Sequence, residues 1–257
     1  MSQTEVNIKH PPPTVERPPV RPLGVWTTFG WAVLAFAIPQ AVFSAIAVIW
    51  FPNHLPGSVV GVTYDGTLVA LAALILNPLQ IALLAAIPPW RTGIGAAEYL
   101  GLTRFTLRDF LVGFLALEVF AAVSDAIVPL IGLDTVPPFQ TEVFTTARAN
   151  GWLAPLALAI VVVGPAGEEI LFRGFLFRGW VMPGARGVVA VVVIAVLWAL
   201  MHVQYAWVFV GQIFIIGLLL GWIRWRSGST LLTIALHIVV NLESTIETMA
   251  KIGWTTR

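Results

Sequence analysis

The sequence predicts an all-α fold, a polytopic bundle of about seven transmembrane helices with a polar cavity inside the membrane. Three observations lead to this prediction. Of the 257 residues, 58% are hydrophobic and 11% are charged, whereas soluble domains carry about 25% charged residues. The apolar residues form runs long enough to cross about 30 Å of hydrocarbon as helices. Ionisable residues recur inside those runs, which points to a polar interior.

Net charge and cysteine content exclude several classes of function. The formal net charge is +1, which gives no reason to expect a nucleic-acid partner. The chain contains no cysteine, so disulfides, thiolate nucleophiles and cysteine-ligated metals are excluded. The expected partners are the lipid bilayer and a membrane-associated peptide or protein substrate.

The chain divides into four parts. Residues 1–22 are polar and proline-rich and are expected to form a disordered tail, without the apolar region of a cleaved signal peptide. Residues 23–149 hold the N-terminal transmembrane helices and an interfacial segment. Residues 150–249 form the transmembrane core that carries the motifs described below, and residues 250–257 are a C-terminal tail.

Seven apolar runs define the expected spans. They cover residues 23–51, 59–89, 105–133, 152–182, 187–202, 207–223 and 229–249. The second span is expected to kink or break at Asn77–Pro78, because proline removes a backbone donor. The polar stretch 134–151 is expected to be a loop, and residues 90–109 a surface loop with a short interfacial helix.

Basic residues predict the orientation, because Lys and Arg concentrate on the cytoplasmic side of a membrane. They cluster before the first span and after the second, fourth and sixth. The residues concerned are Lys9, Arg17, Arg21, Arg91, Arg104, Arg108, Arg178, Arg186, Arg224 and Arg226. We therefore expect a multi-pass protein of a prokaryotic cell membrane with its N-terminus in the cytoplasm.

Two adjacent carboxylates and an arginine lie inside the fourth span. Each charged side chain near a bilayer centre costs roughly 2.5–3.5 kcal/mol on insertion scales, so three of them need a reason. Glu169 and Arg173 are four residues apart and share a helical face, so they can pair. Glu168 points about 100° away. Either the pair is structural and Glu168 is a stray acid, or Arg173 holds Glu169 while Glu168 acts as a general base.

Other ionisable residues lie on other spans. His202 ends the fifth span, and His237 and Asn241 share a face of the seventh. The depth of each side chain in the membrane can be counted along its helix from the interfacial arginines, at about 1.5 Å per residue. By this count Glu168, His237 and Asn241 lie near mid-membrane and can converge there, whereas His202 comes out deeper than the others.

Three motifs in order resemble the CPBP family, the CAAX proteases and bacteriocin-processing enzymes also called Abi. They are Glu168-Glu169-x-x-x-Arg173, Trp198-x-x-x-His202 and His237-x-x-x-Asn241, and the resemblance covers roughly residues 150–245. Trp198 stands where phenylalanine is common. The resemblance implies an intramembrane metalloprotease that hydrolyses peptide bonds of membrane-associated substrates, including prenylated CAAX-type ones. It implies an active site made of Glu168, Glu169, Arg173, His202, His237 and Asn241.

Two mechanisms fit these residue types. In the first, Glu168, His202 and His237 hold Zn²⁺ or another divalent metal whose bound water is the nucleophile. In the second, which needs no metal, Glu168 and His202 activate water while His237 and Asn241 stabilise the oxyanion. The His-Glu-x-x-His pattern of zincins is absent from the sequence.

Two other functions stay open. A proton-coupled transporter would use Glu118, Asp125 and Glu168 as a relay, and it predicts internal repeats or paired broken helices. The sequence shows one expected break and no convincing repeat. A catalytically inactive membrane scaffold predicts a degraded motif set, whereas this set is intact. Glu118 and Asp125 share a face of the third span, where we expect them to line a polar bundle interior.

The glycines just before Glu168 suggest a place for the substrate. Glycine lets another backbone approach closely, so an extended peptide is expected to lie beside residues 164–167. Close packing of helices is the alternative explanation of these glycines.

Overall fold

The computed structural model describes residues 22–50, 65–181 and 184–253. Over these residues every regular element is helical, as predicted. The α-helices are α1 Val25–Trp50, α2 Gly66–Thr92, α3 Ala96–Tyr99, α4 Leu107–Ile127, α5 Pro138–Ala149, α6 Leu153–Leu158, α7 Gly164–Glu169, α8 Phe177–Trp180, α9 Ala185–Leu200, α10 Trp207–Ser227 and α11 Thr230–Ile252. A 3₁₀ turn, Val128–Ile131, extends α4.

Six apolar helices in the described ranges are long enough to cross a membrane, which makes this an integral multi-pass membrane protein. They correspond to the predicted spans except the fifth. That span is α9, an apolar helix of only 16 residues. The predicted number of about seven spans is therefore six long helices and one short one within the described part of the chain.

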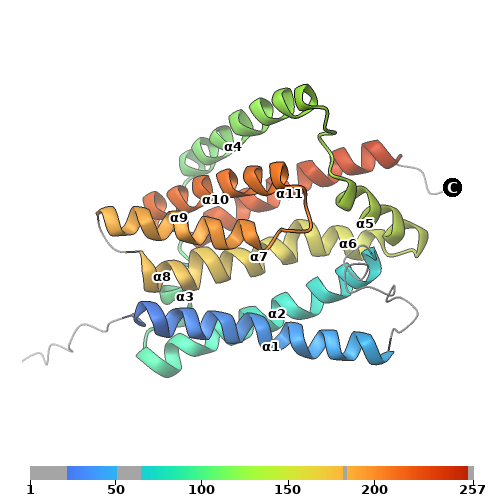
Figure 1. Ribbon diagram of the computed structural model, residues 1–257. Coiled ribbons are helices and arrows are strands. Elements are labelled where there is room, and N and C mark those ends of the chain that lie inside the picture. The colour runs from blue at the N-terminus through green and yellow to red at the C-terminus, as the bar shows by residue number, and fades with distance from the viewer. Residues whose placement is uncertain (1–21, 51–64, 182–183, 254–257) are drawn as a thin grey trace, which may run out of the picture.

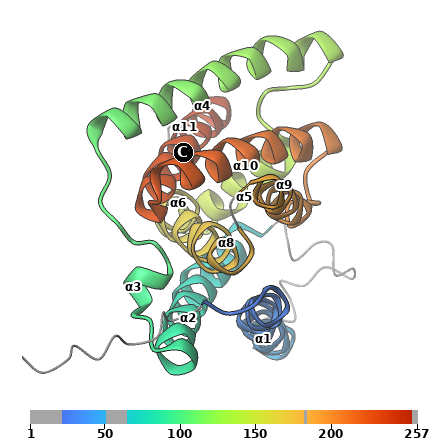
Figure 2. The same ribbon diagram turned by 90° about the vertical axis from the view of Figure 1, so that its left-hand side faces the viewer.

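The fourth span forms the centre of the bundle. It runs continuously from Leu153 to Trp180 and contains α6, α7 and α8, joined by π-helical segments at Ala159–Val163 and Ile170–Leu176. Pro165 explains the first segment, because a proline inside a helix removes a donor and crowds the preceding turn. On one side of this span lie α1 and α2; on the other lie α9, α10 and α11, with α4 outermost (Figures 1 and 2).

The predicted loop at residues 134–151 is wrong, because most of it is the helix α5. Pro138 begins this helix, where a missing N–H costs nothing. The buried residues Gln140, Val143, Phe144 and Ala147 occupy positions i, i+3, i+4 and i+7, which form one face of a helix. The segment is amphipathic, and because its other face is polar, its mean hydropathy did not indicate a helix.

Of the kink or break expected at Asn77–Pro78, the break is absent. The helix α2 continues from Gly66 to Thr92 with Pro78 inside it. It packs along α6 and α7. Neighbouring helices can satisfy the backbone groups that a proline leaves unpaired, so a membrane-spanning helix tolerates proline.

Gly167 faces α2 and leaves no room for a substrate. A Cβ added there would lie 2.0 Å from Asn77 Oδ1 and 2.8 Å from Asn77 Cβ. The carbonyl of Gly167 accepts a hydrogen bond from Gln80 Nε2 at 3.1 Å. The predicted placement of the substrate is therefore wrong at Gly167, where close helix packing explains the glycine. It stays a prediction for Gly164, where an added Cβ would meet only the Ala159 carbonyl, at 3.1 Å.

The contact with Asn77 gives a stability prediction. Gly167→Ala should lower the free energy of unfolding by about 1–3 kcal/mol, as overpacking does, because rotating the Asn77 amide does not relieve the clash with its Cβ. Unfolding in detergent measures this. Gly30→Ala on α1, where an added Cβ meets nothing within 4 Å, is the matched control. Asn77→Gly should restore stability to Gly167→Ala, and equal stability of the two alanine variants would contradict the packing.

Candidate active site

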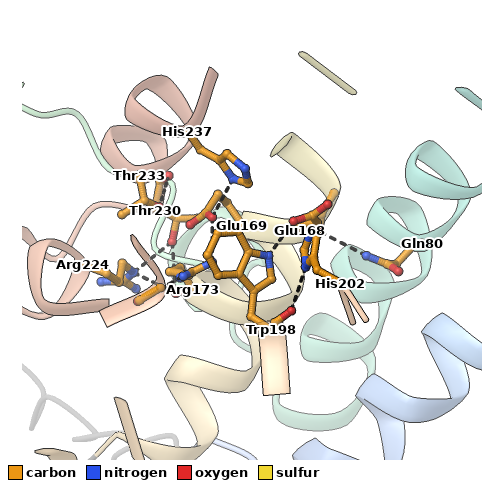
Figure 3. Close-up of polar contacts among 12 residues, drawn as sticks. Gln80, Glu168, Glu169, Arg173, Trp198, His202, Arg224, Thr230, Thr233 and His237 are labelled. Carbon is orange, nitrogen blue, oxygen red and sulfur yellow. Dashed lines mark hydrogen bonds and ion pairs between the residues drawn. The ribbon is translucent and has the colours of Figure 1, made fainter. Parts of the chain in front are cut away.

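Glu169 and Arg173 form the predicted ion pair in the interior of the bundle. Both side chains are fully buried, and Arg173 Nη1 donates to Glu169 Oε1 at 2.8 Å. The same oxygen accepts a hydrogen bond from His237 Nδ1 at 3.0 Å. Arg173 Nη2 donates to the carbonyl of Gly217 on α10 at 3.1 Å. The pair thus joins the central span to α10 and α11 (Figure 3).

The carbonyl of Arg173 is also held by a side chain of a neighbouring helix. It accepts a hydrogen bond from Arg224 Nε at 2.9 Å, and Arg224 also donates to Thr230 Oγ1 at 2.9 Å. Arg173 lies in the π-helical segment Ile170–Leu176, whose hydrogen-bond register differs from that of an α-helix. The backbone around the ion pair is therefore held by side chains from two other elements.

Glu168 points away from the ion pair, as the helical geometry predicts. It is half-buried, and its Oε2 accepts a hydrogen bond from Trp198 Nε1 at 2.5 Å. Its Oε1 has no protein partner among the described residues. Glu168 therefore presents a free carboxylate oxygen next to a fixed one.

His202 lies just beyond the end of α9, in a turn, and is half-buried. Its Nδ1 lies 2.9 Å from the carbonyl of Trp198. A carbonyl can only accept, so Nδ1 carries the proton and Nε2 of the neutral ring is an acceptor. The same argument applies to His237, whose Nδ1 faces the Glu169 carboxylate. His237 Nε2 can donate only when that ring is protonated.

Asn241 lies one turn beyond His237 on α11. Its Nδ2 donates to the carbonyl of Ile160 at 2.8 Å. Ile160 lies in the π-helical segment Ala159–Val163, so the irregular turn of the central span supplies the acceptor. An amide nitrogen carries two protons, which leaves one for another acceptor.

A cavity of about 250 Å³ brings four of the six predicted site residues together. Glu168, His202, His237 and Asn241 line it, whereas Glu169 and Arg173 lie behind it in the packed interior. Its far wall comes from α4, with Glu118 and Asp125 among the lining residues. The prediction that these two acids line a polar interior is confirmed. Across from them the cavity is lined by Glu243 and Glu247 of α11.

The predicted metal ligands do not form a metal centre in this arrangement. No group of three His, Cys, Asp or Glu side chains in the described ranges is arranged to hold one ion. Glu168 Oε2 is bound to the Trp198 indole, and the two imidazoles each pack edge-on against that same indole. The three side chains line one cavity, but their donor atoms do not converge on a single point.

Two aromatic side chains in the lining lie close to the predicted site residues but are not among them. The sequence indicates Trp198 only as the aromatic residue of its motif and gives no separate indication of Tyr205. Tyr205 lies between α9 and α10, and its ring packs edge-on against Phe139 at 5.0 Å. Burial raises the pKa of the Tyr205 hydroxyl, and the Glu168 carboxylate raises it further, so the hydroxyl stays protonated at neutral pH. Only its place directly after the second motif could have drawn attention to it.

The fold and the site together define a class: a multi-pass membrane protein with an intramembrane cavity that carries glutamate, histidine and asparagine side chains. Residues 150–242, from just before α6 into α11, match the family model described as Rce1-like, type II CAAX prenyl endopeptidase. This match confirms, for that segment, the resemblance of the three motifs to the CPBP family. No curated protein and no solved structure matches the chain.

Proposed function

We propose that this protein is an intramembrane endopeptidase that hydrolyses a peptide bond of membrane-associated peptides or proteins, including prenylated CAAX-type substrates. The observation that supports it best is the convergence of Glu168, His202, His237 and Asn241 on one cavity among the spans. These residues come from three separate elements of the segment that matches the endopeptidase family. The proposal includes a prokaryotic cell membrane with the N-terminus in the cytoplasm.

The first step is the activation of water by Glu168 and His202. Glu168 Oε1 and His202 Nε2 are acceptors on the cavity wall, so a water molecule between them can donate to both. As the water oxygen attacks the carbonyl carbon of the substrate, its proton passes to Glu168. The protonated carboxyl then delivers that proton to the leaving amine, which frees the carboxylate for the next turnover.

The negative charge that develops on the substrate oxygen needs donors in the same cavity. The second amide proton of Asn241 is one donor, and Nε2 of a protonated His237 is another. The Glu169 carboxylate faces His237 Nδ1 at 3.0 Å and so fixes the orientation of that ring. Arg173 holds that carboxylate in place, so the buried pair acts on the chemistry through His237.

Cleavage by the purified protein in liposomes tests the proposal. Two peptides with the same sequence, one farnesylated at its CAAX cysteine and one unmodified, are incubated with it, and mass spectrometry reads the products. We expect cleavage within the farnesylated peptide and slower cleavage of the unmodified one, because the lipid holds the substrate in the bilayer. Folded protein that cleaves neither of them, nor any member of a membrane-anchored peptide library, would contradict the proposal.

The same assay separates the two mechanisms. A metal-dependent enzyme should contain about one equivalent of bound metal and lose turnover reversibly on chelation. The donor arrangement favours the metal-free version, so protein stripped of metal and shown to be metal-free should keep its activity. Loss of activity on stripping, restored by Zn²⁺ alone, would reject that version while leaving the endopeptidase proposal intact.

A further inference from the structure

Trp198 lies at the centre of the candidate active site (Figure 3). It belongs to α9, and only 3% of its surface is exposed. Its indole contacts Arg173 of the buried ion pair and the two histidines that line the cavity. The guanidinium of Arg173 lies over the ring, 4.4 Å from its centroid, and the imidazoles of His202 and His237 pack edge-on against it at 5.4 and 5.3 Å.

The indole N–H makes a contact that the hydrocarbon ring of phenylalanine could not make. Trp198 Nε1 donates to Glu168 Oε2 at 2.5 Å, a short hydrogen bond to a carboxylate. An indole nitrogen can only donate, so the bond has one possible direction. It fixes one oxygen of Glu168 and leaves the other facing the cavity, which is the orientation that a general base requires.

The surrounding helices accommodate an indole at this position. A Cβ on Gly217 of α10 would lie 2.9 Å from Cε3 of Trp198, so the glycine makes room for the large ring. The carbonyl of the same Gly217 accepts a hydrogen bond from Arg173. The main chain of Trp198 also takes part, since its carbonyl accepts from His202 Nδ1 and thereby sets the tautomer of that ring.

From these contacts we infer that Trp198 is a positioning residue of the active site: its N–H fixes the rotamer of Glu168 for water activation, while its ring holds His202 and His237 apart. The inference deepens the proposed endopeptidase function and rests on it. The indole acts through Glu168 and has no direct role in the chemistry. Loss of the N–H should therefore lower kcat and leave KM nearly unchanged, because substrate binding does not use it.

The sharpest test removes the N–H and keeps the ring. Trp198→β-(3-benzothienyl)alanine, introduced by codon suppression, replaces the N–H with sulfur in a bicyclic ring of the same shape. We expect kcat to fall about 10- to 100-fold, the size of one lost hydrogen bond to a charged group, with unchanged KM. Trp198→Phe should lose at least as much and also be less stable. The same replacement at Trp222 of α10, which is 48% exposed, is the matched control and should leave kcat unchanged.

An activity-independent measurement separates this inference from the proposed function. The indole N–H resonance of Trp198, identified in ¹⁵N-tryptophan-labelled protein by its loss in Trp198→Phe, should move upfield in Glu168→Ala as the short bond is lost. A resonance that does not respond to Glu168→Ala would overturn the inference whether or not the protein cleaves peptides. Cleavage at the wild-type kcat by the benzothienyl variant would overturn it as well, and in that case the proposed function would stand.

Discussion

Arg173→Met should lower the free energy of unfolding by about 3–5 kcal/mol, because it leaves the Glu169 carboxylate buried without its cation. Methionine fills much of the same volume, so the loss comes mainly from charge. Neither side chain has any exposed surface, and Arg173 Nη1 is 2.8 Å from Glu169 Oε1. Among the described residues Glu169 Oε2 has no hydrogen-bond partner, and without the arginine the carboxylate keeps the hydrogen bond from His237 Nδ1 to its Oε1.

Unfolding in detergent measures this effect against two comparisons. Arg226→Met removes an exposed arginine near the end of α10 and should change stability by less than about 0.5 kcal/mol. The double variant Glu169→Gln with Arg173→Met should recover much of the loss, because replacing both members of a buried pair by neutral groups is often tolerated. If Arg173→Met were as stable as Arg226→Met, the pair would contribute nothing to the fold.

The sequence was informative wherever helical spacing decides the outcome. Glu169 and Arg173 pair because they are four residues apart on one span, and Glu168 points elsewhere for the same reason. His237 and Asn241 both line the cavity because one turn separates them on α11. The apolar runs located the spans, since the length of a transmembrane helix follows from the thickness of the bilayer.

The sequence was uninformative wherever the outcome depends on which helices meet. The glycine at 167 indicated a close approach, but the spacing could not tell that Asn77 of α2 makes it. In the same way, the distance along the chain from Trp198 to Glu168 gives no hint that the indole binds that carboxylate. Contacts between side chains on different helices follow from the packing of the whole bundle, which local periodicity does not determine.

Glu168→Gln should give the largest loss of activity, about 10²- to 10⁴-fold in kcat, the usual contribution of a general base. An amide cannot take the proton from water, although it can still accept the hydrogen bond from Trp198 Nε1. The fold should be kept, because Glu168 is half-buried and lies outside the ion pair of Glu169 with Arg173. Matching unfolding curves for wild type and variant would verify that the loss is chemical.

Glu118→Gln is the comparison that separates a protease from a proton relay. Glu118 lines the same cavity from α4 but belongs to none of the three motifs. A relay through Glu118, Asp125 and Glu168 would stop when either glutamate is neutralised, whereas peptide hydrolysis needs Glu168 and does not need Glu118. Peptide cleavage in liposomes should therefore survive Glu118→Gln at the wild-type order of magnitude and be lost in Glu168→Gln. If cleavage were lost equally in both variants, Glu168 could not be assigned as the base. If the wild-type protein cleaved no peptide but conducted protons, and either variant abolished that proton flux, the transporter function would be supported instead.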